Sequence, residues 1–257
     1  GGAPGYDAVL QALSGLMSIN GEADGPEMRI GIPLVDIITS LNAMSGILMA
    51  VHARSKSGRG QLVDLALLDN AVSVLHPHVG KWFATGETPP RTGVAHPTIC
   101  PYETFECADG PFFIGVGNDS QFRSLTHALG AGHLAEDPRF VTNSDRLAHA
   151  AELREILGEL VGDVERQQLS DLCRAAGVPA GAVNTVGEAM SLPQVIHREM
   201  VVERDGYRSV GIPVKLSRTP GAIRFGPRDR GADTDAVLAE LGITEDQAAG
   251  LRAAGVL

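Results

Sequence analysis

Carboxylates, aromatic side chains and glycine turns are the groups with which this sequence could do chemistry. Several common catalytic and nucleotide-binding patterns are absent, namely GxGxxG after a strand, a phosphate-loop lysine, GxSxG and HExxH. His76 and His78 lie two residues apart with no thiolate or carboxylate at helical spacing, so we expect no metal site. Asp36 stands before a long apolar stretch, where a carboxylate could act as a nucleophile or simply cap a helix.

Three further side chains and one basic cluster are candidates. Tyr6 could line a site or pack as an ordinary aromatic residue. His96 lies in a proline-rich loop, and loops carry both functional residues and tolerated variation. Asp119 follows Asn118 in a stretch that also suits a turn or a helix cap. The dense basic cluster could bind phosphates or form a solvated helix end, and it consists of Arg54, Lys56 and Arg59.

Composition limits the classes of function. The 257 residues can form one large domain or two modest ones, and 44% hydrophobic with 20% charged residues is ordinary for a globular protein. A formal net charge of −10 argues against general nucleic-acid binding. The odd number of cysteines, without metal-ligand spacing, indicates reduced thiols: Cys100, Cys107 and Cys173. We find no apolar run long enough to span a bilayer and no leading signal, and therefore expect a cytoplasmic protein without membrane partners.

The first third of the chain predicts an α/β layered arrangement. Apolar spacing predicts a helix over 8–17 with Asp7 as its N-cap, and glycine and proline predict a loop over 21–31. A long apolar helix follows Asp36 and stops in the basic residues 54–60. The remaining predictions are a strand over 61–68 and a helix from Asp69 to about Thr85.

The middle of the chain predicts a smaller α+β unit. Residues 102–117 are typical of a hairpin with Ala-Asp-Gly at its turn. Three amphipathic helices and a short strand are predicted over 121–129, 151–160, 167–176 and 178–183. The chain is then extended from Ser191 and closes on two short helices, within 232–242 and 244–255. The segments are therefore 1–75 (large-domain remainder), 76–95 (linker), 96–185 (small domain) and 186–257 (return segment and helices packing on the large domain).

A resemblance to a known family extends over essentially the whole sequence. Its motifs include Gly5-Tyr6-Asp7, ProLeuValAsp36 and the run from Ser57 to Asp64. They continue through AlaHisPro97, ProTyrGluThrPhe105, GlyAsnAsp119, AspProArgPhe140 and ThrAspAlaValLeuAlaGluLeuGly242. In this order and spacing they resemble class III CoA-transferases, the family of formyl-CoA transferase and its relative α-methylacyl-CoA racemase.

The resemblance implies a fold, a reaction and a nucleophile. The fold would be a Rossmann-like large domain, here without the family's N-terminal portion, plus a smaller α+β domain. Asp36 matches the family's nucleophilic aspartate, which passes through a mixed anhydride and an aspartyl-CoA thioester. CoA thioesters would be substrates, with no permanently bound cofactor. The resemblance also implies an interlocked homodimer, and the missing portion could instead come from a companion chain.

The resemblance assigns roles to the other candidates. Tyr6 resembles a tyrosine lining the acyl site, whereas racemases carry a catalytic histidine there, and a phenol replaces an imidazole poorly in proton exchange. His96 replaces a glycine run in the active-site loop, which implies a dicarboxylic acid substrate. Asp119 matches a supporting glutamate of racemases, and the basic cluster would meet CoA phosphates. The alternatives are a racemase-type isomerase and a non-catalytic fragment that needs a companion chain.

Overall fold

The computed structural model describes residues 4–257, with both helices and short strands. Its contacts divide the chain into two units, Gly1–Val183 and Asn184–Leu257, which we describe in turn. Residues 1–3, the start of the expected segment 1–75, lie outside the described residues. The four-part division into domains stays a prediction.

Within the first unit, residues 99–183 form what we call the α+β module. Strands β1 (Tyr102–Cys107) and β2 (Gly110–Gly115) form the antiparallel hairpin predicted from Ala-Asp-Gly, and Gly110 adopts a φ of 130° at its turn. Strand β3 (Ala180–Ala182) adds to the other edge of β2. The three predicted helices are confirmed, each shifted by one or two residues: α6 (Asp119–Ala128), α8 (Ala150–Val161) and α9 (Arg166–Ala175).

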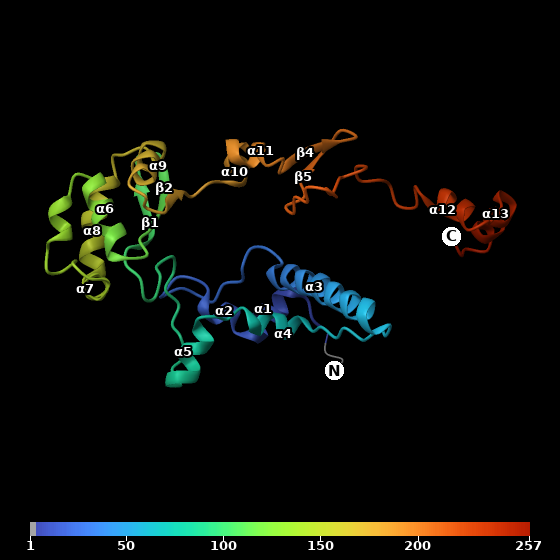
Figure 1. Cartoon of the computed structure of the whole chain (residues 1–257), viewed down its shortest axis with the longest axis horizontal. Helices are drawn as coiled ribbons and strands as arrows, with labels where there is room; N and C mark the ends of the chain where they lie inside the picture. Colours follow the sequence, from blue (N-terminus) through green and yellow to red (C-terminus); the bar gives the residue numbers. More distant parts are fainter. Residues whose placement is uncertain (1–3) are drawn as a thin grey trace. The chain divides into compact units, whose positions relative to one another are not determined.

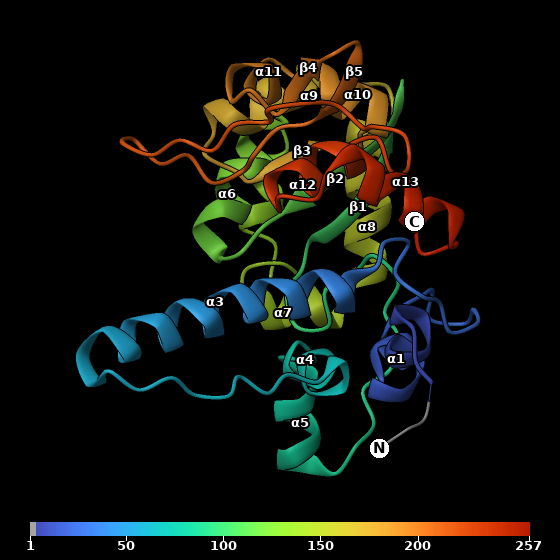
Figure 2. The same ribbon diagram turned by 90° about the vertical axis from the view of Figure 1, so that its right-hand side faces the viewer.

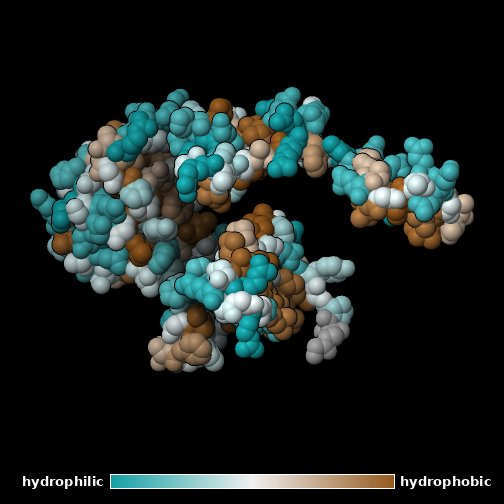
Figure 3. Space-filling model, turned by 45° about the vertical axis from the view of Figure 1, so that its right-hand side comes forward, coloured by the Kyte–Doolittle hydropathy of each residue, from teal (hydrophilic) through white to brown (hydrophobic). Residues whose placement is uncertain are grey.

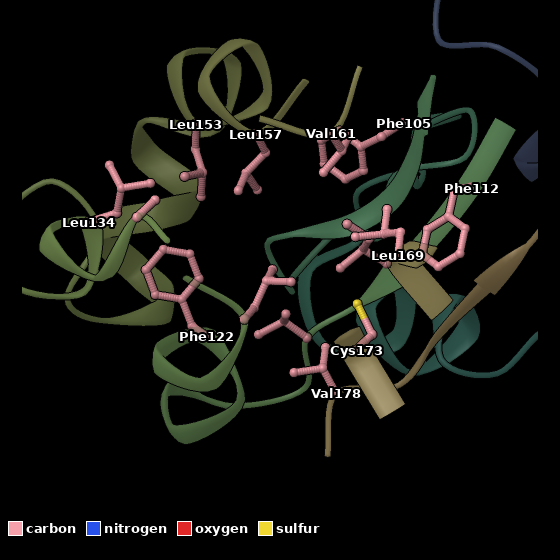
Figure 4. Close-up of a cluster of buried hydrophobic side chains, with 14 of the residues drawn as sticks. Phe105, Phe112, Phe122, Leu134, Leu153, Leu157, Val161, Leu169, Cys173 and Val178 are labelled. Atoms are coloured by element: carbon pink, nitrogen blue, oxygen red, sulfur yellow. The ribbon is translucent and has the colours of Figure 1, made fainter. Parts of the chain in front are cut away.

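Apolar side chains from these helices and strands meet in one core (Figure 4). Phe122 from α6, Leu157 from α8 and Leu169 from α9 belong to one buried cluster with Phe112 on the sheet. Two shorter elements complete the module, the 3₁₀ helix η1 (Gly132–Ala135) and α7 (Asn143–Ala148). Because these residues bury one another, the module supplies its own core.

The preceding residues form helices only, which we call the α1–α5 segment. Helix α1 (Asp7–Ser14) and helix α2 (Leu16–Ile19) divide the single predicted helix at Gly15, whose φ of 95° suits glycine. The long apolar helix is confirmed as α3 (Leu34–Ser57), ended by Gly58 in the left-handed region. It packs against α1 and against α4 (Leu67–Ser73), as Figure 1 shows.

Two predictions for this segment are wrong. Residues 61–66 are extended but pair with no strand among the described residues, so the predicted strand over 61–68 is not formed. A strand is stabilised by hydrogen bonds to a neighbouring strand, and these mostly exposed residues have no such neighbour in the described chain. The helix predicted from Asp69 to Thr85 is two helices, α4 and α5 (His78–Thr85), because Pro77 between them has no N–H to continue a helix.

Helix α3 also corrects the prediction that no apolar run could span a bilayer. Its 24 residues contain an 18-residue stretch of mean hydropathy 1.7, of which 6% is buried. By length and composition this helix could cross a membrane. Core helices of soluble proteins pass the same test, so the observation alone does not place the chain in a membrane.

Most of the surface of α3 lacks a partner within the described chain. Figure 2 shows its C-terminal half extending beyond α4, with the segment after Gly58 returning alongside it. Apolar side chains gather on the surface of the α1–α5 segment (Figure 3), and those on α3 include Leu41, Met44, Ile47 and Leu48. Only Val35 of this helix is buried. A helix apolar on so many faces is typical of the interior of a larger fold.

The second unit, Asn184–Leu257, is mostly extended between short elements, as predicted from Ser191 onward. It contains α10 (Val186–Ser191), α11 (Pro193–His197), a hairpin of β4 (Val201–Arg204) and β5 (Tyr207–Val210), α12 (Thr234–Glu240) and α13 (Glu245–Ala253). The last two helices lie within the predicted ranges. The hairpin was not predicted, although Asp205-Gly206 at its turn has positive φ at both positions, as a type I′ turn requires.

Candidate active site

The N-terminus of α3 is capped by a residue from another helix. An Asp7 carboxylate oxygen accepts hydrogen bonds from the backbone N–H groups of Val35 at 2.7 Å and Asp36 at 3.2 Å. The other Asp7 oxygen accepts from the Gln11 side chain at 2.6 Å. Asp7 was predicted to cap its own helix, but the N-cap position of α1 is Tyr6. Asp7 therefore fixes the start of the helix that carries Asp36.

Buried Gln11 supports the same point in the fold. Its side-chain oxygen accepts from the Ile30 N–H at 2.8 Å, and its amide nitrogen also lies 3.4 Å from the Ile32 carbonyl oxygen. Gln11 thus holds residues 30–32, which lead into α3, against α1. Neither Asp7 nor Gln11 was predicted to do this, because contacts across 19 to 29 positions leave no local pattern in the sequence.

Asp36 occupies the first turn of α3 and is exposed. No hydrogen bond to its carboxylate is recorded within residues 4–257, and its backbone oxygen accepts from the Ser40 hydroxyl at 2.8 Å. The interpretation of Asp36 as a plain helix cap is therefore wrong, since Asp7 supplies the cap. A first-turn carboxylate with no structural partner in the described chain is available to react.

The backbone amides of this first turn are already used. In the stretch 34–37, two N–H groups donate to Asp7, and the others donate to the carbonyl oxygens of Ile32 at 2.9 Å and Pro33 at 3.0 Å. These amides cannot also form an oxyanion site while Asp7 remains in place. The helix dipole still favours negative charge near Asp36. The start of α3 would therefore orient Asp36 and supply an electrostatic field, but no free N–H donors.

Tyr6 directly precedes the capping residue and is 83% exposed. Its backbone oxygen accepts from the N–H groups of Val9 and Leu10, which begins α1. The side chain therefore does not pack as a core aromatic within the described chain. Tyr6 is thus adjacent in the chain to Asp7, whose carboxylate accepts a hydrogen bond from the Asp36 N–H.

His96 lies in the loop before β1 and is held by two backbone contacts. Its N–H donates to the Tyr102 carbonyl oxygen at 3.1 Å, and its Nδ1 accepts from the Thr98 N–H at 3.2 Å. The His96 and Tyr102 rings meet edge to face, with centroids 5.2 Å apart. Because Nδ1 is an acceptor, the proton of the neutral imidazole is on Nε2.

Asp119 begins α6, but Asn118 caps the helix by accepting from the Gln121 N–H at 2.9 Å. The Asp119 carboxylate instead accepts from Arg146 at 2.7 Å. Arg146 is fully buried and also donates to the Cys100 carbonyl oxygen at 2.7 Å. Asp119 thus joins α6 to α7 and to the end of the His96 loop. The helix cap predicted as an alternative over residues 118–120 is formed, with Asn118 as the capping residue.

The basic cluster lies at and just beyond the opposite end of α3 from Asp36. Arg54, Lys56 and Arg59 are exposed, and no ion pair is recorded for them within residues 4–257. At a helical rise of roughly 1.5 Å per residue, Arg54 is about 27 Å from Asp36 along the helix. A single ligand could contact both only if it were long and flexible.

One set of contacts joins the chain before α3 to the chain before His96. Arg91 donates to the carbonyl oxygen of Gly25 at 2.6 Å and forms an ion pair with Glu27 at 2.9 Å. The Gly93 N–H donates to the Gly21 carbonyl oxygen at 3.1 Å. The Glu27 backbone N–H and the Arg91 charge lower the pKa of Glu27. No hydrogen bond or ion pair between Asp36 and His96 themselves is recorded in the described chain.

The other nucleophile types are less suited to reaction. All three cysteines are free and buried, and desolvation raises the pKa of the Cys100 and Cys107 thiols and that of Cys173 to about 11. These thiols stay protonated at neutral pH and are poor nucleophiles. Within residues 4–257, no group of three or more potential metal ligands is found. Exposed carboxylates such as Asp36 are therefore better candidates for the nucleophile than the buried thiols.

Comparisons with known proteins agree on one class of enzyme. The model of CoA-transferase family III matches residues 1–234. The chain is 39% identical to succinate–glutarate CoA-transferase of Agrobacterium fabrum, covering 92% of this chain and 60% of the relative. It is 38% identical to acetyl-CoA:oxalate CoA-transferase of Acetobacter aceti, covering 83% of this chain and 55% of the relative. This chain therefore belongs to CoA-transferase family III.

A solved structure supports the same relationship. The crystal structure of a CAIB/BAIF family protein from Brucella suis matches with a TM-score of 0.81 at 37% identity, covering 92% of this chain and 63% of that one. The chain thus spans 55–63% of the length of these relatives. The family confirms the resemblance found in the sequence, and the particular residue roles stay predictions.

Proposed function

We propose that this chain transfers coenzyme A between an acyl-CoA and a carboxylic acid, with Asp36 as the nucleophile. The observation that carries the proposal is the start of α3, where Asp7 takes over the capping of the helix and leaves the Asp36 carboxylate exposed. Membership of CoA-transferase family III supplies the reaction class. Burial of the thiols disfavours the competing nucleophiles of the described chain.

The proposed reaction proceeds through two covalent states of Asp36. A carboxylate oxygen attacks the thioester carbonyl carbon, the C–S bond breaks, and CoA leaves as a thiolate from a mixed anhydride. The thiolate then attacks the Asp36 carbonyl carbon, which releases the first acid and forms an aspartyl-CoA thioester. An incoming carboxylate reverses these steps. CoA is a substrate throughout, and no resident cofactor is required.

A small dicarboxylic acid is the proposed substrate class. The relatives named for succinate and glutarate, and for oxalate, act on dicarboxylic acids. His96 presents an Nε2–H donor, since its Nδ1 accepts from Thr98. We propose that this donor binds the carboxylate at the end of the acid that does not react. Tyr6 is assigned to the acyl group, and Asp119 acts as an indirect support through Arg146.

The basic cluster of Arg54, Lys56 and Arg59 is proposed to meet the CoA phosphates. Its position about 27 Å along α3 from Asp36 suits the two ends of an extended thioester. The absence of recorded ion pairs for these cations within residues 4–257 leaves their charge available. Neutralising all three should raise the KM for acyl-CoA without preventing formation of the aspartyl intermediate at saturation.

Further polypeptide is proposed to cover α3. A 24-residue apolar helix with one buried residue is unsuited to exposure, and relatives contain length that this chain does not match. That polypeptide would complete a Rossmann-like domain, supplied by a longer chain or a companion, in a cytoplasmic homodimer. Light scattering on an active preparation, together with mass spectrometry of its chains, tests this. A stable monomer made of this chain alone would contradict it.

Acyl-CoA racemisation is the alternative, with Asp36 as one base. Tyr6 disfavours it, because a phenol replaces an imidazole poorly as the group that exchanges an α-proton at neutral pH. Deuterium incorporation at the α-carbon, without a second carboxylic acid, would favour racemisation. A third possibility is that the chain is inactive without a companion, which addition of the companion polypeptide would reveal.

Trapping of the intermediate is the direct test. An active preparation incubated with acyl-CoA and hydroxylamine should gain a hydroxamate on Asp36, located by peptide mass spectrometry. The reagent captures only an activated carboxyl, so unmodified carboxylates such as Asp64 are internal controls. Modification that depends on acyl-CoA but falls on another residue would refute the assignment of Asp36.

A further inference from the structure

The loop that carries His96 is held by side chains of α7. The Asn143 side-chain amide donates to the Thr98 carbonyl oxygen at 2.9 Å, and its oxygen accepts from the Cys100 N–H at 3.1 Å. Arg146, one turn further along α7, donates to the Cys100 carbonyl oxygen at 2.7 Å. One asparagine side chain therefore binds the backbone on both sides of residue 99, the carbonyl oxygen before it and the N–H after it.

The held residue is the one that contacts the His96 ring. Thr98 receives the Asn143 hydrogen bond at its carbonyl oxygen and donates its own N–H to His96 Nδ1 at 3.2 Å. A backbone N–H can donate to Nδ1 only when that nitrogen carries its lone pair. The neutral ring is then protonated at Nε2, and the ring orientation follows from the position of Thr98.

We propose that Asn143 is a positioning residue for acid selection. By fixing Thr98, it sets the tautomer and orientation of His96, so that Nε2–H is the donor offered to the remote carboxylate. This inference rests on the proposed role of His96 in dicarboxylate binding. Asn143 is half-buried at the start of α7, and the loop engages both groups of its side-chain amide. It would therefore affect the acid only indirectly, through His96.

Thr142 offers a matched control on the same helix. Its hydroxyl caps α7 by accepting from the Asp145 N–H, and it forms a capping box with that residue. Thr142→Ala thus weakens α7 without removing a contact to Thr98 or Cys100. Asn143→Ala removes both loop contacts, whereas Asn143→Asp keeps an acceptor for Cys100 and loses the donor to Thr98. Arg146 is unsuitable, because its replacement would leave the buried carbonyl oxygen of Cys100 unpaired.

The first measurement is the ¹⁵N–¹⁵N scalar coupling across the hydrogen bond from the Thr98 amide to His96 Nδ1, recorded on this chain. We expect the coupling in the wild type and in Thr142→Ala, and its loss in Asn143→Ala and Asn143→Asp. Amide spectra of each variant establish that the module is folded. Absence of the coupling in the wild type, its persistence in both Asn143 variants, or its loss in Thr142→Ala would overturn the inference.

The second measurement is acid selection in an active preparation. Asn143→Ala should lower the ratio of kcat/KM for glutarate over butyrate by about three- to tenfold, while Thr142→Ala leaves the ratio unchanged. An unchanged ratio in Asn143→Ala overturns the inference. If His96→Gly also leaves the ratio unchanged, the proposed role of His96 fails. If only Asn143→Ala does so, that role stands, and the coupling shows whether Asn143 still holds the loop.

Discussion

The α+β module and the α1–α5 segment differ in how much of their apolar surface they bury themselves. Seventeen residues of the module form one buried core, while the buried cluster of the α1–α5 segment contains only Leu10, Leu16, Val35 and Ala71. Yet the α1–α5 segment has the longest helix of the described chain and the candidate nucleophile. The proposed chemistry therefore lies in the region that buries less of its own apolar surface.

The two regions also divide the proposed work. Asp36, whose helix is capped by Asp7, belongs to the region with the smaller buried cluster. Asp119 and the residues that hold the His96 loop belong to the module, which is packed independently. We therefore expect changes in the α1–α5 segment to act first on reaction, and changes in the module to act first on stability or acid choice.

The largest expected effect is on the reaction itself. Asp36→Ala should abolish CoA transfer in an active preparation, because no other described carboxylate occupies the first turn of α3. Stability should barely change, since Asp7 rather than Asp36 caps the helix. The measurements are transfer rate and urea unfolding, with Asp36→Asn as a second variant. Activity within a factor of a few of wild type would exclude Asp36 as nucleophile.

A matched pair of leucines tests the difference in packing. Leu157 in the module is 0% exposed and Leu48 on α3 is 61% exposed. Leu157→Ala should cost about 2–5 kcal/mol of unfolding free energy through cavity formation. Leu48→Ala should stay within about 0.5 kcal/mol in the monomeric chain. Urea titration measures both, and equal costs would show that α3 is covered in solution.

The same difference explains what could be predicted from the sequence. In the module, the Ala108-Asp109-Gly110 turn and the helical spacing act locally, and the hairpin and all three helices were predicted correctly. The predicted strand over 61–68 was wrong because a strand needs a partner, and none lies within the described chain. The hairpin of β4 and β5 was not predicted, although Asp205-Gly206 is a local turn signal.

The candidate site divides in a similar way. Asp36 could be located from the sequence because the apolar helix and the family motif both mark it. The cap from Asp7 could not, since it joins residues 28 and 29 positions apart. Likewise, the contact of Asp119 with Arg146 spans 27 positions, so no local pattern indicates it. Local patterns identify the candidate groups, and tertiary contacts decide which of them are free.

Acid choice provides the third test, directed at the His96 loop, which Asn143 of the module contacts. His96→Gly removes the Nε2–H donor, and a hydrogen bond to a charged group is worth about 1.5–3 kcal/mol. The preference for a dicarboxylate over its monocarboxylate analogue should therefore fall by about ten- to a hundredfold. The ratio of kcat/KM for the two acids measures it. A constant ratio would mean that His96 only shapes the loop.

The cap of α3 provides a smaller effect in the other region. Asp7→Ala removes the acceptor for two backbone N–H groups and should cost about 1 kcal/mol, together with a loss of transfer. Asp7→Asn keeps a side-chain oxygen and should recover most of the stability. Hydrogen exchange of the Val35 and Asp36 amides reports the cap directly. Faster exchange in Asp7→Ala without any loss of transfer would separate capping from catalysis.

The smallest effect concerns the response of the module to acid. Hydrogen bonds from the Arg139 side chain and N–H lower the pKa of Asp137 from its ordinary 3.8 to about 2. A carboxyl whose pKa is lower in the folded state stabilises the fold when ionised. This contribution is therefore present above pH 3.8 and lost as the pH falls toward about 2.

Replacement of Asp137 should reduce that acid response. Asp137→Asn should flatten the fall in unfolding free energy below pH 3.8, because asparagine does not titrate. Asp163→Asn, at an exposed turn of the same module, is the control and should keep the wild-type slope. Urea unfolding monitored by module amides across this pH range measures the slopes. If both variants match the wild type, the Arg139 contact does not couple to folding, and the module's stability at acid pH rests on its apolar core.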